Sequence, residues 1–396
     1  MIQIEPLLKN VQKAARYTGG ELNSVMKKPE EVNIRFAFCF PDVYEIGMSH
    51  LGMKILYHLM NEREDTWVER VFAPWEDMER EMRQAHIPLF ALESREPIAK
   101  FDFVGFTLQY EMSYSNIINM LDLAGIPLRS SERTEDMPFV CAGGPCAFNP
   151  EPLADFIDFY LLGEGEEIWP EVLDVFATWK ESGAGREQFL IEISHIKGIY
   201  VPAFYDVIWN EEGQFVGLRP NRTDAAAVVQ KRIIQNLDQA YYPDRMIVPY
   251  MEIVHDRIML EVFRGCIRGC RFCQAGMIYR PVREKDSTTL CNFAEKLIET
   301  TGYDEISLAS LSTSDYTQLP ELMEGLLTFS EKEHVSLSLP SLRIDNFSLD
   351  LMEKVQKVRK SGLTFAPEAG TQRLRDVINK GITEEDLMRG AKLAFE

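Results

Sequence analysis

The sequence predicts an α/β protein in which a doubly wound parallel sheet is followed by a second, incomplete series of strand–helix units. Short apolar runs alternate with amphipathic stretches of helical period, and the runs lack a polar face, which is typical of parallel strands covered on both sides. Several runs end directly in glycine, which lets a strand turn sharply into a helix. The 396 residues suit two or three domains. We expect an N-terminal helix and lead-in (1–30), a first α/β domain (31–185), a connecting segment (186–250) and a second α/β series (251–396).

The first series contains five expected strands separated by expected helices. The strand candidates are 34–40, 67–73, 103–107, 139–142 and 156–162, and the helix candidates are 51–61, 75–84, 114–123 and 168–179. Five strands in this order fit a flavodoxin-like doubly wound sheet, which binds ligands beyond the carboxyl ends of its strands. Residues 198–202 and 216–219 are expected as short strands of the connecting segment.

The second series contains four expected strand–helix units. The strand candidates are 259–263, 305–309, 335–339 and 363–366, and the helix candidates are 293–300, 319–329, 349–358, 373–378 and 384–394. Four units are half of an eight-unit barrel. We therefore expect a partial barrel, truncated at the C-terminus, with an exposed edge of the kind that proteins normally cover. A further C-terminal segment or a partner chain would complete it.

Composition narrows the class of function. The net charge of −20 argues against a broad basic surface and so disfavours nucleic acid as a partner, without excluding a local basic groove. There is no apolar run of membrane-spanning length and no secretory leader pattern, so we expect a cytoplasmic protein without a membrane partner. Seven cysteines in such a chain do not indicate a disulfide framework.

Three of these cysteines carry the functional prediction. Cys266, Cys270 and Cys273 lie within eight residues, directly after the first strand of the second series. Thiolates are the soft ligands that iron–sulfur centres use. Three of them leave one iron of a [4Fe–4S] cluster open to bind another molecule. The flanking glycines allow the loop to wrap a bulky cluster; they are Gly265, Gly269 and Gly276.

Three alternatives to this cluster stay open. Zinc would need a fourth ligand, and the nearest candidates, Cys291 and His255, do not have the spacing of a ligand pair. A simple electron-carrier cluster would need a fourth cysteine nearby. The third alternative is a chance grouping of buried cysteines.

The Cys-x3-Cys-x2-Cys pattern, with Phe272 before the third cysteine and Arg264-Gly265 before the first, resembles the signature of radical-SAM enzymes. The resemblance implies that S-adenosylmethionine (SAM) binds the open iron through its amino and carboxylate groups. An electron, delivered by a donor such as flavodoxin or ferredoxin, would then cleave SAM to methionine and a 5′-deoxyadenosyl radical. In such enzymes the cofactors perform the chemistry and the protein orients them.

The same resemblance suggests SAM-binding residues. Phe272 would pack near the cluster and SAM. Ser310, after the second strand, occupies the usual amino-group site, although the typical Gly-Gly-Glu is missing. Arg343 would reach the SAM carboxylate, or be a surface cation. Glu368, in Pro-Glu-Ala-Gly, would contact the ribose, or be a solvated loop carboxylate. Lys380-Gly381 also resembles the radical-SAM pattern, but the resemblance assigns it no role.

The first domain resembles that of cobalamin-binding radical-SAM enzymes through residues 101–107, 141–145 and 158–166. A vestigial domain that no longer binds cobalamin is the alternative, and its glycines would then be only tight turns. The histidine motif Asp-x-His-x-x-Gly is not matched, so His50 is interpreted as a helix-start or core residue. The resemblance implies a corrin site lined by Gly105, Thr107, Gly143, Gly144, Gly163 and Gly165.

The predicted function is therefore that of a radical-SAM enzyme. With cobalamin it would transfer a methyl group to an unreactive carbon. Without cobalamin, hydrogen abstraction, rearrangement or a methylthiotransferase-like reaction stay open. The alternative is a non-catalytic cluster- or cobalamin-binding protein, or an inactive fragment of a longer enzyme. The sequence assigns no catalytic residue beyond the cluster ligands, and no substrate.

Overall fold

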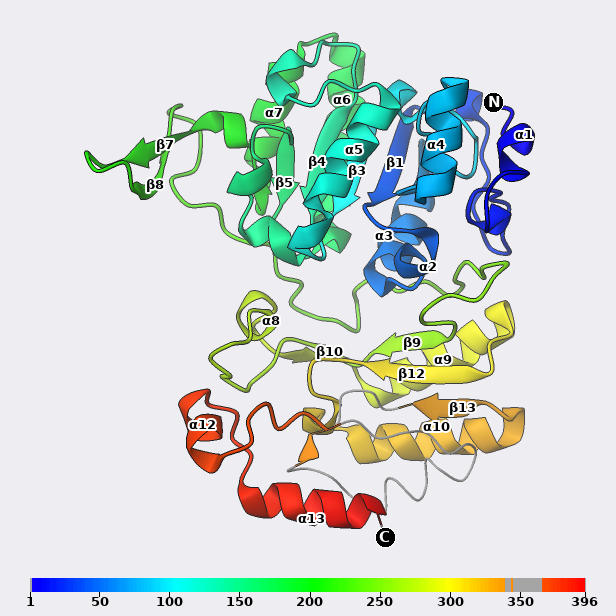
Figure 1. Cartoon of the computed structure of the whole chain (residues 1–396), viewed down its shortest axis with the longest axis vertical. Coiled ribbons are helices and arrows are strands. Elements are labelled where there is room, and N and C mark those ends of the chain that lie inside the picture. Colours follow the sequence, from blue (N-terminus) through cyan, green and yellow to red (C-terminus); the bar gives the residue numbers. More distant parts are fainter. Residues whose placement is uncertain (1, 339–342, 345–364, 396) are drawn as a thin grey trace. The chain divides into compact units, whose positions relative to one another are not determined.

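The computed structural model describes residues 2–338, 343–344 and 365–395. The chain divides into two compact units, each with its own sheet (Figure 1). Unit 1 comprises Met1–Ile234, Tyr241–Pro243 and Ile247–Val254. Unit 2 comprises Gln235–Ala240, Asp244–Met246 and His255–Glu396.

Unit 1 is built on a six-stranded sheet with the order β2-β1-β3-β4-β5-β6. The first five strands pair in parallel, and β6 pairs antiparallel with β5. This order is flavodoxin-like, so the predicted doubly wound sheet is confirmed. The strands are β1 (Ile34–Phe40), β2 (Thr66–Phe72), β3 (Phe103–Thr107), β4 (Phe139–Gly143), β5 (Phe159–Leu161) and β6 (Ile199–Tyr200).

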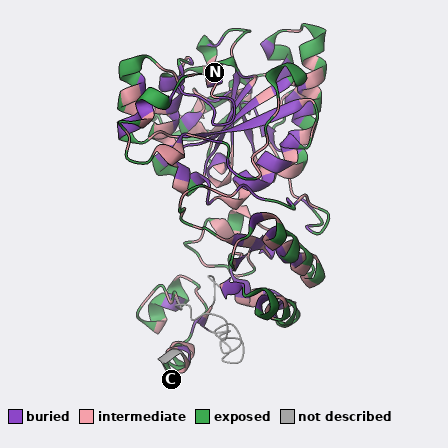
Figure 2. Ribbon diagram, turned by 90° about the vertical axis from the view of Figure 1, so that its right-hand side faces the viewer, coloured by how far each residue is buried: buried purple, intermediate pink, exposed green. Residues whose placement is uncertain are grey.

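Helices cover both faces of this sheet. One face packs against α3 (Leu51–Asn61), α6 (Gly165–Ser182) and α7 (Arg186–Ser194). The other face packs against α4 (Glu76–Ala85) and α5 (Tyr114–Ala124). The buried residues follow the strands, and the outer sides of the helices are exposed (Figure 2). The remaining helices of unit 1 are the short α1 (Glu5–Leu8) and α2 (Tyr44–Gly47).

The alternation of side chains along β1 shows how the sequence specifies two cores. Phe36 and Phe38 enter the core under α3, α6 and α7, while Ala37 and Cys39 enter the core under α4 and α5. Successive strand residues point to opposite faces. An apolar run without polar alternation therefore requires cover on both sides, as the structure provides.

The segment after α6 differs from the prediction. Residues 198–202 were expected in the connecting segment, but β6 extends the sheet of unit 1, with Tyr200 opposite Tyr160. Helix α7 was not predicted either. Its buried residues, Phe189, Leu190 and Ile193, do not form a long amphipathic stripe, so the helical period is weak. The predicted strand 216–219 lies in a hairpin of β7 (Tyr205–Trp209) and β8 (Phe215–Pro220).

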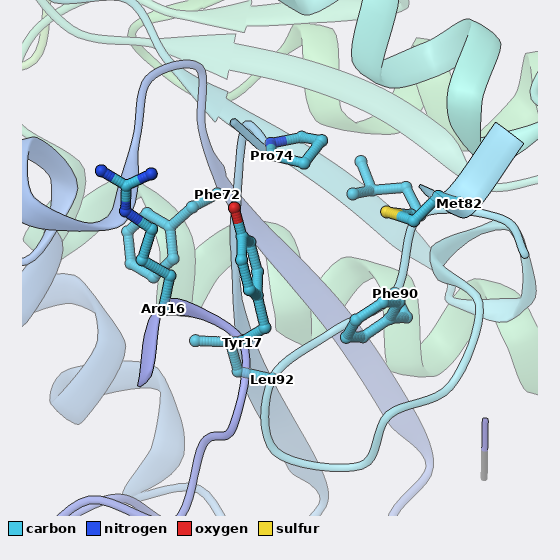
Figure 3. Close-up of a pocket in the computed structure, with 8 residues that line it drawn as sticks. Arg16, Tyr17, Phe72, Pro74, Met82, Phe90 and Leu92 are labelled. Carbon is cyan, nitrogen blue, oxygen red and sulfur yellow. The ribbon is translucent and has the colours of Figure 1, made fainter. Parts of the chain in front are cut away.

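The edge strand β2 is covered by other parts of unit 1. Arg70, which is 1% exposed, places its guanidinium between the carboxylates of Glu21 and Glu93, and its carbonyl accepts a hydrogen bond from the amide of Leu92. A cavity of about 20 Å³ lies under this cover (Figure 3). It has room for about one water molecule and none for a cofactor. Its lining residues are Arg16, Tyr17, Phe72, Pro74, Met82, Leu89, Phe90 and Leu92.

Unit 2 contains a parallel sheet with the order β13-β12-β9. The described residues show these three strands and no closed barrel. The predicted strand 259–263 ends early because the chain leaves the sheet to form the antiparallel pair β10–β11. The strands are β9 (Ile258–Glu261), β10 (Phe263–Arg264), β11 (Arg283–Glu284), β12 (Glu305–Ala309) and β13 (Ser336–Ser338).

Four of the described helices of unit 2 follow the predicted order, whereas the short α8 (Ala275–Ile278), directly after the cysteines, was not predicted. The four are α9 (Ser287–Thr301), α10 (Leu319–Glu333), α12 (Gln372–Val377) and α13 (Glu384–Phe395). The predicted helix 349–358 and the start of the predicted strand 363–366 lie outside the described residues. In the described part of the chain, no helix has the length and apolar character needed to cross a membrane.

Candidate functional site

The cysteine loop begins where β10 ends. Gly265 has φ +90°, and a Cβ on this residue would lie 2.6 Å from the carbonyl oxygen of Pro281. Both the positive φ and this close approach require glycine. The turn therefore directs the chain from β10 into Cys266 only with a glycine at this position.

The three cysteines of the loop are free and half-buried. The amide of Arg268 donates to Sγ of Cys266 at 3.4 Å, and the amide of Gly276 donates to Sγ of Cys273 at 3.3 Å. Among the described residues, no three His, Cys, Asp or Glu side chains form a group that could hold a metal ion. The thiols thus share one loop without forming a closed ligand set.

Cys291 and His255, the candidates for a fourth zinc ligand, each lie in an environment that does not favour metal binding. Cys291 lies in α9, where burial and the nearby Glu295 and Asp286 raise the pKa of its thiol. A raised pKa disfavours the thiolate that a metal needs. Nδ1 of His255 lies 3.1 Å from the guanidinium of Arg257.

The loop is anchored first to the segment that follows β12. Nε of Arg268 donates to Oδ2 of Asp315 at 2.8 Å, and a second guanidinium nitrogen also binds this carboxylate. Ser312 donates its hydroxyl to Oδ2 at 2.7 Å. Burial opposes ionisation of Asp315, but the bonds from Arg268 and Ser312 outweigh it, so the pKa of Asp315 is lowered. Arg268 lies between two of the cysteines, so this ion pair fixes the middle of the loop.

A second anchor comes from the segment that follows α12. The amide of Arg271 donates to the carbonyl of Ile378 at 2.9 Å, and Nδ2 of Asn379 donates to the carbonyl of Gly269 at 2.8 Å. Asn379 has φ +56°, a left-handed conformation that asparagine tolerates better than most residues. Neither Asp315 nor Asn379 was predicted, because nothing in their local sequence marks a partner so far along the chain.

Three of the predicted SAM residues meet at Lys380. Nζ of Lys380 lies 3.2 Å from Oε1 of Glu368 and 5.9 Å from the ring centroid of Phe272. A guanidinium nitrogen of Arg343 donates to the carbonyl of Lys380 at 3.2 Å. Ser310 is not part of this contact group, and its hydroxyl pairs with that of Thr313 at 2.9 Å.

The backbone at Glu368 adopts an unusual conformation. Its φ is +67°, which is strained for a residue with a Cβ, and such strain concentrates at functional sites. The buried Arg375 braces this turn, since its guanidinium donates to the carbonyls of Ala369 at 2.9 Å and Ile382 at 3.0 Å. Arg375 was not predicted, because a charged helix residue normally indicates an exposed face.

A buried charge cluster lies at the start of the loop. Glu261 ends β9, and Arg264 donates two hydrogen bonds of 2.9 Å to its carboxylate. Nζ of Lys285, whose side chain is 1% exposed, lies 3.6 Å from the same carboxylate. Burial opposes the charged form of Glu261, but Arg264 and Lys285 outweigh it and lower its pKa.

In unit 1, three predicted cofactor residues lie at the carboxyl edge of the sheet. Thr107 ends β3 and accepts a hydrogen bond of 2.7 Å from the side chain of Gln109. Gly143 ends β4, and Gly144 has φ +106° with its backbone close to the carbonyl of Leu108. Parallel strands present their ligand site at this edge. The strongly exposed Tyr110 and Met112 follow directly after β3.

The other three predicted glycines are explained by packing inside unit 1. A Cβ on Gly105, within β3, would lie 2.4 Å from the Phe36 ring. A Cβ on Gly163 would lie 2.1 Å from the carbonyl of Arg232, whose segment runs beside it. Gly165 begins α6 and packs against Leu56. The contacts of these three glycines are therefore with the chain itself.

The interpretation of His50 as a helix-start residue is confirmed. Its Nδ1 accepts a hydrogen bond of 3.1 Å from the amide of Met53 and so caps α3. Burial lowers the pKa of His50 to about 4, with a smaller contribution from Lys54. The ring is therefore neutral at physiological pH, which lets Nδ1 accept this bond.

Comparison with known families identifies both parts of the chain. Residues 52–202 match the family described as radical SAM proteins, N-terminal. Residues 260–396 match the radical SAM superfamily. The second match begins in β9 and includes all three cysteines of the loop.

Curated relatives are longer than this chain. An uncharacterized protein of Methanocaldococcus jannaschii, MJ0966, is 26% identical over 361 residues, which are 90% of this chain and 66% of that protein. An uncharacterized methyltransferase of Pyrococcus horikoshii, PH0819, is 25% identical over 278 residues, which are 65% of this chain and 51% of that protein. A putative methylthiotransferase, MJ0865 of M. jannaschii, is 23% identical over 35% of this chain and 32% of that protein. The chain thus spans 66% or less of the length of each.

Solved structures show the same fold at low identity. The cobalamin-dependent SAM radical enzyme OxsB, with aqua-cobalamin and SAM bound, matches 91% of this chain and 47% of its own, with a TM-score of 0.59 and 13% identity. The radical SAM methyltransferase TsrM from Kitasatospora setae, with cobalamin and a [4Fe–4S] cluster bound, matches 91% of this chain and 65% of its own, with a TM-score of 0.57 and 12% identity. The two family models show that the chain belongs to the radical SAM superfamily, and the solved structures show that it has the fold of cobalamin-dependent radical SAM enzymes.

Proposed function

We propose that Cys266, Cys270 and Cys273 hold a [4Fe–4S] cluster whose open iron binds SAM for reductive cleavage. When bound and reduced, the cluster supplies the electron that breaks the sulfonium–C5′ bond, which gives methionine and a 5′-deoxyadenosyl radical. The electron would come from an external donor such as a flavodoxin or ferredoxin. The observation that carries this proposal is the anchoring of the cysteine loop to two segments. The segment after β12 carries Ser310, and the segment after α12 leads to Lys380, which contacts Phe272, Arg343 and Glu368.

The donor set of the loop fits such a cluster. Three free thiols lie on one loop, and backbone amides already point at two of the sulfur atoms. Hydrogen bonds to cysteine sulfur tune iron–sulfur centres.

The residues around Lys380 would receive SAM. In this proposal the Phe272 ring packs against the bound molecule, Arg343 reaches its carboxylate, and the Glu368 carboxylate accepts hydrogen bonds from the ribose hydroxyls. Ser310 would contact the amino group, and its hydroxyl bond to Thr313 would orient it. These side chains bind and orient SAM and transfer no proton themselves.

We further propose that cobalamin binds at the carboxyl edge of the unit 1 sheet. Thr107, Gly143 and Gly144 lie at that edge, and the exposed Tyr110 and Met112 could cover an apolar ligand there. Both OxsB and TsrM hold cobalamin in matching folds. The packing of Gly105, Gly163 and Gly165 gives these glycines no part in this proposal. The downstream reaction would then be methyl transfer, as the description of TsrM as a methyltransferase favours.

Cluster loading and SAM cleavage test this proposal together. The protein would be reconstituted anaerobically with iron and sulfide, reduced with dithionite, and assayed for iron and for 5′-deoxyadenosine. Wild type should hold about four iron ions per chain and form 5′-deoxyadenosine. Alanine at Cys266, Cys270 or Cys273 should abolish both, whereas Cys291→Ala should abolish neither. Equal losses in all four variants, or zinc in place of iron, would contradict the proposal.

A further inference from the structure

We propose that Lys380 is a positioning residue of the SAM site, which holds the Glu368 carboxylate and the Phe272 ring in one arrangement. This inference rests on the proposed function and adds to it a residue that the resemblance left without a role. Lys380 has contacts with three of the four predicted SAM residues, namely Phe272, Arg343 and Glu368.

The side chain of Lys380 is not an ordinary surface cation. It is only 13% exposed, while its partner Glu368 is 38% exposed. Lysines are seldom this buried unless they are paired. Its ammonium group is held between a carboxylate at 3.2 Å and an aromatic ring at 5.9 Å, so two different kinds of contact fix its position.

Lys380 occupies only one of the two carboxylate oxygens of Glu368, so the other can accept a hydrogen bond from a ligand. Lys380 binds Oε1, and within the part of the chain that the structure describes, Oε2 has no hydrogen-bond partner. An ionised carboxylate is an acceptor only. A molecule with neighbouring hydroxyl groups, such as the ribose of SAM, could therefore donate to Oε2 of a carboxylate whose rotation Lys380 already restricts.

The backbone around Lys380 joins this carboxylate to the cysteine loop. The two residues before it, Ile378 and Asn379, bind the loop at Arg271 and Gly269, and its own carbonyl accepts from Arg343. A displacement of the loop therefore displaces Lys380 and its partners with it. Fixed relative positions of this kind lower the ordering cost of ligand binding.

Equilibrium SAM binding to the reconstituted protein tests the inference. We expect Lys380→Met to weaken SAM binding about tenfold, because one charge-assisted contact is lost. Lys380→Arg should restore binding to within about threefold of wild type, since it keeps the charge. Lys332→Met is the matched control, because Lys332 is 79% exposed on α10. Iron content and the far-ultraviolet circular dichroism should be unchanged in all three variants.

A double-mutant cycle with Glu368→Gln tests whether Lys380 affects SAM binding through the Glu368 carboxylate. The combined loss in Lys380→Met/Glu368→Gln should be clearly smaller than the sum of the single losses, because both changes remove one interaction. Wild-type SAM affinity in Lys380→Met, or additive losses in the cycle, would overturn the inference. A wild-type protein that holds no cluster or binds no SAM would instead contradict the proposed function, and so the two failures are distinguishable.

Discussion

The positive φ of Glu368 leads to a prediction that separates stability from function. At His86 and His334 the same conformation ends a helix, but Glu368 lies in a stretch without regular structure. Glu368→Ala and Glu368→Gly both remove the carboxylate and its pair with Lys380. The two variants differ from each other only in the Cβ, so their difference in stability contains the backbone strain of alanine and the chain entropy of glycine, and no side-chain contact of Glu368.

The expected difference in free energy of unfolding follows from two opposing terms. A left-handed conformation costs a residue with a Cβ about 1–2 kcal/mol. Glycine loses more chain entropy on folding, worth roughly 0.5–1 kcal/mol. Taking the midpoints of both ranges, the glycine variant should be more stable than the alanine variant by about 0.8 kcal/mol. In a helix or strand the order would be reversed.

Two optical signals make this measurable in urea. All five tryptophans lie in unit 1, so fluorescence follows unit 1, whereas far-ultraviolet circular dichroism follows both units. The two variants should give the same fluorescence transition. Their circular dichroism transitions should differ, with the glycine variant unfolding at the higher urea concentration.

SAM binding should not follow this order of stability. Both variants should lose SAM affinity to a similar extent, because both lack the carboxylate. An alanine variant as stable as the glycine variant would refute the strain argument. A glycine variant that binds SAM as wild type does would refute the assignment of Glu368 to the SAM site.

Three further predictions concern the loop and the cap of α3. Asp315→Asn should speed the loss of iron to a chelator several-fold, because it weakens the anchor of the cysteine loop; unchanged kinetics would argue against that anchor. Gly265→Ala should prevent cluster loading, since its Cβ would lie 2.6 Å from a carbonyl oxygen, whereas Gly276→Ala, with 3.6 Å to its nearest atom, should load iron; equal iron contents would contradict this. The pKa of His50 is lowered to about 4 from 6.5, so stability should fall as pH drops from about 6.5 to about 4, by up to about 3 kcal/mol. His50→Asn, which keeps a capping side chain, should lose that component in urea unfolding at several pH values, and an identical pH profile would contradict the assignment.

Features with a short sequence period were predictable. Strands β1 and β3 and helix α3 have the predicted bounds, because their apolar residues repeat with a clear strand or helix period. The three cysteines also lie close together in the sequence, so their spacing alone predicted which loop would hold the cluster. His50 was also interpreted correctly, since a residue just before an apolar helical stretch is a natural cap.

Features that depend on distant contacts were not predictable. The bond between Asn379 and Gly269 joins residues 110 positions apart, and no periodicity records it. The predicted corrin-site glycines show a related limit of sequence reasoning. Gly105 and Gly163 resemble ligand-binding glycines in sequence, but their missing side chains make room for Phe36 and for the backbone at Arg232. Only the fold shows which neighbour a glycine accommodates.

Electron paramagnetic resonance of the anaerobically reconstituted and reduced protein tests the central claim most directly. Spectra would be recorded with and without SAM, in wild type and in Cys270→Ala. We predict a [4Fe–4S]⁺ signal whose g values change when SAM is added, and no such signal in the variant. A cluster signal that is indifferent to SAM, or a protein that takes up zinc and no iron, would contradict the account.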